Sequence, residues 1–151
     1  MTVIQVDLTK AVPAPVTAAY VRRVIRNAAR VPEVAARVPA ATVSVAVRLV
    51  GDDAIRELHR RFAQDDSVTD VLSFEGEGDH AGDIAISWPA VVRQARKHRH
   101  PVDSELALLS VHGFLHLLGW DHATPAQNRE MTRLTLAGLA LSGVKLAARR
   151  L

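Results

Sequence analysis

Three histidines near the end of an apolar stretch have the residue type and spacing to bind a metal ion. His112 and His116 are four residues apart and His122 follows in the segment HGFLHLLGWDH. On a helix, residues four apart lie one turn above each other with Cβ atoms about 5–6 Å apart, so both imidazoles can reach one ion. Gly119 can end such a helix in the left-handed conformation and bring His122 back toward the other two. Three unrelated histidines are the alternative, but this spacing favours a shared site.

Three neutral nitrogen ligands with an open fourth position are typical of a catalytic zinc site rather than a closed structural one. The chain contains no cysteine, which excludes thiolate zinc sites and any disulfide partner. Imidazole suits several divalent ions, so the pattern predicts one metal per chain, with Zn²⁺ preferred and another divalent ion not excluded. Because imidazole must be neutral to bind, metal occupancy is expected to fall as the pH drops through about 6.

The general motif with this spacing is the metalloprotease pattern H-E-x-x-H-x-x-G-x-x-H. The three histidines and Gly119 fall in its places, but Gly113 stands where the glutamate general base belongs. Peptide hydrolysis needs that base, so a zinc peptidase is a disfavoured alternative. Phosphodiester cleavage depends less on a dedicated glutamate, because zinc can lower the pKa of bound water toward ~7 or neutralise charge on the phosphorane. The histidines would then act through metal-bound water.

Residues beside the motif have roles that the sequence leaves open. Asp121 either orients one of the imidazoles by accepting a hydrogen bond from it, or caps the turn beside Gly119. Glu105, two helical turns before His112, either approaches the site or complements the helix dipole. Trp120 is expected to stack on a base, to shield the metal or to complete the core. His80 lies in an acidic, glycine-rich segment, which favours a solvated loop over a metal contact.

Hydrophobic periodicity predicts the elements that must position this site. Strands are expected over 2–9 and 41–50, followed by a hairpin of 71–74 and 84–88 with a long loop over 75–82. Helices are expected over about 15–29, 52–62, 89–98, from a cap at Asp103 or Ser104 to Gly119, and 125–141 after an N-cap at Thr124. The 103–118 helix is apolar on nearly all faces and should be buried at the centre. Inward positions include Ile55, Leu58 and Phe62 in the second helix, and Met131, Leu134 and Leu141 in the last.

The remaining segments read as connections. Pro32 and Pro39 bracket a connector, residues 64–70 form a polar loop, and the tail ending in Arg149 and Arg150 is expected to fray. The order of elements predicts a single α+β domain over residues 1–151. It would have a roughly four-stranded mixed sheet packed with about five helices, with the metal site at the end of the central helix.

The basic residues permit a nucleic-acid partner. The net charge is only +3, but 16 arginines stand against 3 lysines and the pI is about 9.9. The arginine fork suits phosphate recognition, although a solvated helix face is the commoner reason for such stripes. The candidate RNA contacts are Arg22, Arg26, Arg30, Arg60, Arg61, Arg93, Arg96 and Lys97. No apolar stretch approaches the ~20 residues of a membrane span and the first residues do not read as a signal peptide, so a cytoplasmic location without a membrane partner is expected.

The segment from His112 to His122 resembles the signature of the YbeY family of bacterial endoribonucleases and rRNA maturation factors. Two further segments agree with it, Thr69–Phe74 and Gly82–Ser87, and the resemblance covers about residues 40–135. It implies a small α+β domain acting as a zinc-dependent, single-strand-specific endoribonuclease in 16S rRNA 3′-end maturation and ribosome quality control. The three motif histidines would be the metal ligands, and a 16S rRNA precursor and the ribosome or its small subunit the partners.

Two positions depart from the family pattern. An arginine that serves RNA binding or catalysis in the family is replaced by Ala63 when the chain is counted back without gaps, and the asparagine four residues earlier by His59. Arg60 and Arg61 are close in sequence but point elsewhere on a helix, so the role does not transfer to them. These departures motivate a second hypothesis, an rRNA-binding assembly factor with weak or no turnover whose metal organises the site.

Overall fold

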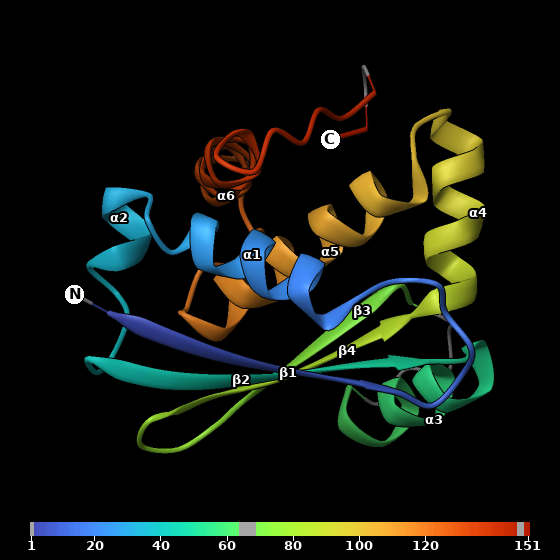
Figure 1. The fold of residues 1–151 in the computed structure, drawn as a ribbon, viewed down its shortest axis with the longest axis horizontal. Helices are drawn as coiled ribbons and strands as arrows, with labels where there is room; N and C mark the ends of the chain where they lie inside the picture. The colour runs from blue at the N-terminus through green and yellow to red at the C-terminus, as the bar shows by residue number, and fades with distance from the viewer. Residues whose placement is uncertain (1, 64–68, 148–149) are drawn as a thin grey trace.

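A four-stranded sheet with helices on both faces forms the protein (Figure 1). The computed structural model describes residues 2–63, 69–147 and 150–151, with the backbone alone at residue 63. The elements in chain order are β1 (Val3–Lys10), α1 (Ala18–Ala28), α2 (Pro32–Ala35), β2 (Thr42–Val50), α3 (Asp52–Ala63), β3 (Val71–Glu75), β4 (His80–Ser87), α4 (Trp88–His98), α5 (Val102–Leu117) and α6 (Pro125–Ala140).

The sheet is mixed, in the order β1-β2-β4-β3. The β1, β2 and β4 strands run parallel, and β3 pairs antiparallel with β4 at the edge. Alternation sets the buried face: Val43, Val45, Val47 and Leu49 of β2 are all buried while the residues between them are more exposed. The predicted α+β class and four-stranded mixed sheet are confirmed.

The helix α5 packs against the sheet and is surrounded by other helices. Figure 1 shows α1 and α5 over one face with α6 beyond them, and α3 beside the opposite face. Both β3 and β4 contact α5, which also contacts α1, α4 and α6. Its apolar residues therefore meet protein on nearly every side, as predicted for a helix without a polar face. The helix begins at Val102 after Pro101, earlier than the predicted cap at Asp103 or Ser104.

Further predicted boundaries were wrong. The first helix, α1, begins at Ala18 rather than near residue 15, because the Thr17 side chain caps it. The connector between Pro32 and Pro39 contains the short helix α2, which Pro32 can begin because the first helical position needs no N–H donor. The β3–β4 loop is short, because the strand resumes at His80 and Gly82 pairs with Glu75. Trp88 belongs to α4 rather than to the preceding strand, since the Ser87 side chain accepts a hydrogen bond from the backbone of Ala90 and starts that helix.

Two residues predicted to face the core do not. Phe62 is 62% exposed and packs edge-on against Phe74 of β3, with ring centroids 5.1 Å apart, because it lies in the last turn of α3. Leu141 is 48% exposed because it follows the last residue of α6. Ile55, Met131 and Leu134 are buried as predicted. The predicted loop lies outside the described residues over 64–68, as does Arg149 of the tail.

Candidate metal centre

The three histidines of the motif come together at the end of α5. Their ligand atoms all lie within 4.8 Å of one another, and no other group of three His, Asp or Glu side chains in the described residues has this geometry. Ring centroids are 4.7 Å apart for His112 and His116, 5.5 Å for His112 and His122, and 5.1 Å for His116 and His122. Three imidazole nitrogens within 4.8 Å of one another fit a single metal ion, since zinc–nitrogen bonds are about 2.0–2.1 Å long.

A hydrogen-bonded turn brings His122 to the other two rings. The backbone N–H of Gly119 donates to the carbonyl of His116 at 3.0 Å, and that of Trp120 donates to the carbonyl of Leu115 at 3.1 Å. Gly119 has a φ of +100°, as predicted for the residue that reverses the chain. Asp121 accepts a hydrogen bond from the backbone N–H of His122 at 2.7 Å, which is the turn-capping contact of its two predicted roles.

The electrostatics of the cluster favour neutral imidazoles. The pKa of His112 is lowered to about 4, first by burial and then by the positive charges of His116, His122 and Arg150. The pKa of His116 is also lowered, first by burial and then by His122, while Asp121 opposes the shift. Neutral imidazole is the form that binds a metal ion, so these residues fit a divalent cation.

An open hollow of about 390 Å³ lies next to the three rings, between α5 and β3. Besides the histidines, its lining residues are Thr69, Asp70, Val71, Leu72, Ser73 and Glu75. Because His122 is exposed and the other two rings are half-buried, a bound ion would have a coordination position facing this space. The arrangement matches an open site that admits a substrate group.

The place of the missing glutamate is closed by packing. A Cβ atom at Gly113 would lie 2.7 Å from Cγ2 of Ile84 and 3.2 Å from Oγ of Ser73. The Ser73 hydroxyl also donates to the Gly113 carbonyl at 3.0 Å, which ties β3 to α5. Position 113 therefore faces the sheet and has no room for a side chain. This geometry weighs against the peptidase alternative.

Asp70 is a site residue that the histidine motif did not reveal. Asp70 is one of the residues that line the hollow. Burial raises the pKa of its carboxyl group above the usual range, with the charge of Glu105 adding to the effect. Hydrogen bonds to the backbone and the nearby Arg150 act in the opposite direction. Asp70 stands in the Thr69–Phe74 segment, but no spacing rule connects it with histidines some forty residues later.

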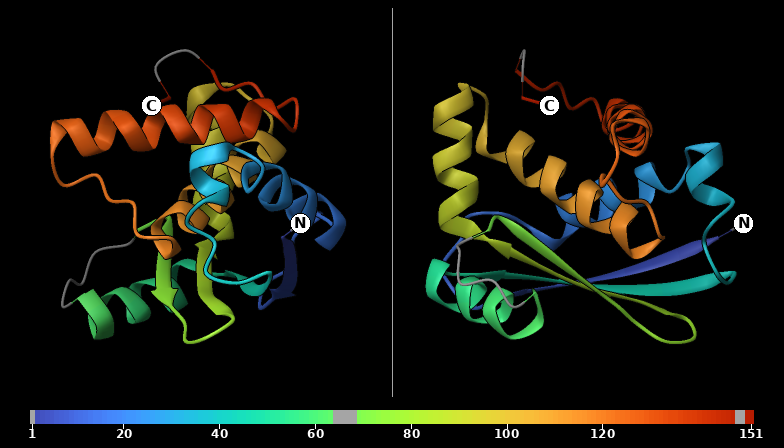
Figure 2. Two further views of the ribbon diagram at one scale, coloured as in Figure 1. Left: turned by 90° about the vertical axis from the view of Figure 1, so that its left-hand side faces the viewer. Right: turned by 180° about the vertical axis from the view of Figure 1, so that it is seen from behind.

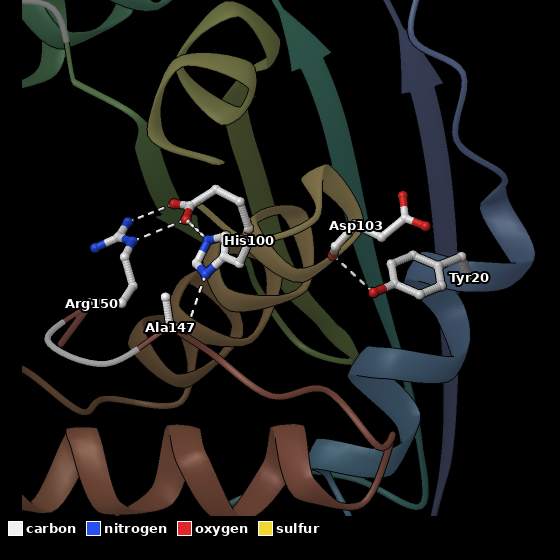
Figure 3. Close-up of polar contacts among 6 residues, drawn as sticks. Tyr20, His100, Asp103, Ala147 and Arg150 are labelled. Carbon is white, nitrogen blue, oxygen red and sulfur yellow. Dashed lines mark hydrogen bonds and ion pairs between the residues drawn. The ribbon is translucent and has the colours of Figure 1, made fainter. Parts of the chain in front are cut away.

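Glu105 lies in a buried network of side chains next to the histidine site (Figure 3). Its carboxylate is fully buried and accepts hydrogen bonds from Nε of Arg150 at 2.9 Å and Nη2 at 2.5 Å. His100 Nε2 lies 2.8 Å from the same carboxylate. Glu105 lies in the first turn of α5, as its predicted helix-dipole role requires. The sequence did not predict its partners, which come from beyond the end of α4 and from near the C-terminus. Arg150 is therefore held in place, against the expectation that the tail frays.

Trp120 completes the core. Its ring is 5% exposed, its indole N–H donates to Glu130 at 3.3 Å, and the Arg37 guanidinium lies 3.8 Å from the ring centroid. The ring face is therefore not free to stack on a base.

His80 lies in β4, where its ring nitrogens contact Ser44 at 2.7 Å and Asp83 at 3.2 Å. The solvated-loop interpretation of His80 was wrong because the strand begins earlier than predicted.

The predicted RNA contacts do not line the histidine hollow. Arg26 donates to the Ile4 carbonyl at 2.7 Å, and it lines a different hollow together with Arg22 beside β1. Arg93 pairs with Asp52 at 2.7 Å and Arg60 pairs with Glu57 at 2.6 Å. The others are exposed on helix surfaces or just beyond a helix: Arg30, Arg61, Arg96 and Lys97. The side chain of Ala63 lies outside the described residues.

Across the described residues, no helix combines the length and the apolar character needed to cross a bilayer.

Comparison with known proteins places the chain in a family. Residues 5–140 match the family described as Endoribonuclease YbeY. A protein of that name from Symbiobacterium thermophilum is 42% identical over 132 residues, which cover 78% of this chain and 85% of the relative. One from Roseiflexus castenholzii is 34% identical over 92% of this chain and 94% of the relative, and one from Gloeobacter violaceus is 43% identical over 71% and 60%.

A solved structure shares the fold. The solution structure of TM1509 from Thermotoga maritima superposes with a TM-score of 0.58 and 24% sequence identity, and the match covers 91% of this chain and 89% of that one. The residues that match the family, 5–140, include most of β1, the other three strands, and the helix that carries the first two histidines. The chain belongs to the Endoribonuclease YbeY family.

Proposed function

We propose that this member of an endoribonuclease family is a zinc-dependent enzyme that cleaves single-stranded RNA in 16S rRNA 3′-end maturation and ribosome quality control. Residues 1–151 would form one ribonuclease domain that acts in the cytoplasm on the small ribosomal subunit or its precursor. The observation that supports this most strongly is the convergence of three histidine side chains beside an open hollow.

Each residue of the site has a part in this proposal. His112, His116 and His122 hold the ion, which supplies Lewis-acid chemistry at a phosphodiester group. Gly119 sets the direction from which His122 approaches, and Asp121 fixes the turn through the His122 backbone. Asp70 lines the space where the phosphodiester would lie, and its raised pKa brings the carboxyl group closer to the range in which it can exchange a proton at neutral pH.

His116→Ala tests the proposal. The variant should lose about one zinc per chain, because two imidazoles bind far more weakly than three, and it should lose cleavage of a 16S 3′ precursor. Metal content by mass spectrometry and product formation on a gel are the measurements. His98→Ala, a histidine on α4 away from the hollow, serves as the matched control and should retain both. Undiminished cleavage by purified His116→Ala would place the activity elsewhere.

A binding module without turnover is the second candidate. It is favoured by Ala63 and His59 at the departing positions and by the absence of the predicted basic side chains from the hollow. Single-turnover incubation with the 16S 3′ precursor separates the two functions. Salt-sensitive binding without product would support the module, whereas product that requires His116 would support the enzyme.

A further inference from the structure

Arg37 is held over an aromatic ring beside the metal centre. It follows α2, and its guanidinium lies 3.8 Å from the centroid of the Trp120 ring. Trp120 itself is buried and anchored through its N–H to Glu130. A guanidinium stacked on a fixed aromatic ring gains cation–π stabilisation and loses part of its freedom before any ligand arrives.

The charge of Arg37 is not used inside the protein. Across the residues that the structure describes, its side chain has no hydrogen bond and no ion pair, and the residue is exposed. Arg93 and Arg150 differ in this respect, because each donates to a carboxylate at short distance. Arg37 therefore presents a fork of five N–H donors that is held in place without being neutralised.

A hollow of about 310 Å³ lies in front of this guanidinium. Arg37, Glu75 and Gly119 are among its lining residues, and Glu75 also lines the histidine hollow, so the two spaces adjoin. A Cβ placed on Gly119 would lie 3.6 Å from Nη1 of Arg37, while the Gly119 N–H bonds the carbonyl of His116. The guanidinium thus flanks the turn that carries the third histidine.

We propose that Arg37 binds a backbone phosphate of the RNA strand next to the phosphodiester held in the histidine hollow. This inference rests on the proposed function. A guanidinium fork matches two phosphate oxygens, and a charge-assisted pair of this kind is stronger than a neutral hydrogen bond. A base stacked on the guanidinium would use its face and leave the five donors in its plane without acceptors, so the phosphate is the better match.

The test measures equilibrium binding of a fluorescent single-stranded RNA over a range of salt concentrations. Zinc-loaded and chelator-treated protein are both used, and gels check that the RNA stays intact. Arg37→Ala should weaken binding about 3- to 10-fold and should make the slope of log K against log salt shallower by about 0.7, the value for one phosphate contact on a single strand. Arg37→Lys should keep the slope and recover part of the affinity, because it keeps the charge but not the fork.

The matched control is Arg23→Ala. Arg23 also lies over an aromatic ring, 5.6 Å from the centroid of Tyr20, but Tyr20 contacts Asp103 at the opposite end of α5, roughly 24 Å away along the 16-residue helix. It should change neither affinity nor slope. The zinc content of Arg37→Ala should match the wild type, which shows that the ligand turn is intact.

Three results would overturn the inference. The first is unchanged affinity and slope in Arg37→Ala, and the second is weaker binding with an unchanged slope, which would indicate base stacking instead. The third is loss of zinc in the variant, which would mean that Arg37 only supports the turn. A wild-type protein that binds no single-stranded RNA would instead refute the proposed function itself.

Discussion

At the scale of single residues, Gly113 shows how closely α5 approaches the sheet. The Ile84 side chain lies so close to the Cα of Gly113 that no side chain fits between them. The Ser73 hydroxyl donates a hydrogen bond to the Gly113 carbonyl. This contact positions the helix turn that carries His112. The residue that separates this motif from a metalloprotease pattern is therefore also a packing requirement of the fold.

Gly113→Ala should destabilise the protein by about 1–3 kcal/mol, the usual cost of inserting a methyl group into a well-packed core. The predicted Cβ contact with Ile84 Cγ2 at 2.7 Å is with a branched side chain in a central strand, which has little freedom to move. Urea unfolding followed by circular dichroism measures the change.

Ile84→Ala provides the control for that experiment, since it removes the clashing atom. The double variant should lose less stability than the two single variants added together. Strict additivity, or a Gly113→Ala variant as stable as the wild type, would contradict the packing argument.

The three-histidine group could be predicted from the sequence, because its members lie within eleven consecutive residues and the first two follow helix spacing. Asp70 and Arg37 could not, because they reach the same region through the fold. Arg37 in particular depends on α2, a helix of four residues that no periodicity marks, and on Trp120 offering it a ring face.

At the scale of elements, the Glu105 network joins the start of α5 to the end of α4 and to the C-terminus (Figure 3). The backbone N–H of Ala147 donates to Nδ1 of His100 at 3.2 Å, so the proton that faces Glu105 sits on Nε2. Burial alone raises the pKa of Glu105, but the hydrogen bonds from Arg150 and His100 outweigh it and the pKa lies below its ordinary value. The carboxylate is thus charged, buried and dependent on its partners.

Arg150→Ala should cost up to about 3 kcal/mol at pH 7, because it leaves a buried carboxylate with His100 as its remaining side-chain partner. A lowered folded-state pKa means that Glu105 contributes stability above its unfolded pKa and loses it as the pH falls through the lower folded value. The difference between wild type and variant should therefore shrink below about pH 4.5, where the carboxyl group is protonated in the unfolded chain and in the variant.

Chemical unfolding of both proteins between pH 3 and 8 measures this dependence. Arg150→Lys keeps the charge without the fork and should fall between them. A difference that stays constant over the whole range would show that Arg150 acts through packing rather than through the charge of Glu105.

Element types were predictable where periodicity was strong, as in β2 and α5, while element ends were not. Trp88 alternates correctly with Ile84 and Ile86, yet the Ser87 cap converts it into the first residue of α4. Phe62 has the right helical phase for the core, but it lies in the last turn of α3, where it is 62% exposed and packs against Phe74 of β3. In each case, a neighbouring element decided what the local pattern left open.

At the scale of the whole molecule, the histidine site lies where α5 ends beside the edge strand β3. The two views of Figure 2 show α5 enclosed between the sheet and the other helices. The sequence predicts the α+β class, since class depends on element types. The strand order β1-β2-β4-β3 could not be predicted from the sequence, because the pairing of Val3 with Thr42 and of Ser44 with His80 depends on contacts between distant segments.

Zinc should raise the melting temperature of the wild-type protein and leave His116→Ala almost unchanged. A ligand that binds only the folded state adds RT ln(1 + [L]/Kd), or about 2.7 kcal/mol at one hundred times Kd. Differential scanning calorimetry with and without zinc measures the shift. An equal shift in both proteins would mean that the stabilising ion binds outside the three histidines.

The turn at Gly119 has a further consequence for the order in which the protein assembles. The chain between the first and last histidine is short, and the entropy needed to close a loop grows only with the logarithm of its length. The parallel pairing of β1 with β2, by contrast, must wait for a long stretch of chain to collapse, and such non-local contacts limit folding rates. The loop that joins the three histidines can therefore close as soon as the end of α5 is helical, before the sheet is complete.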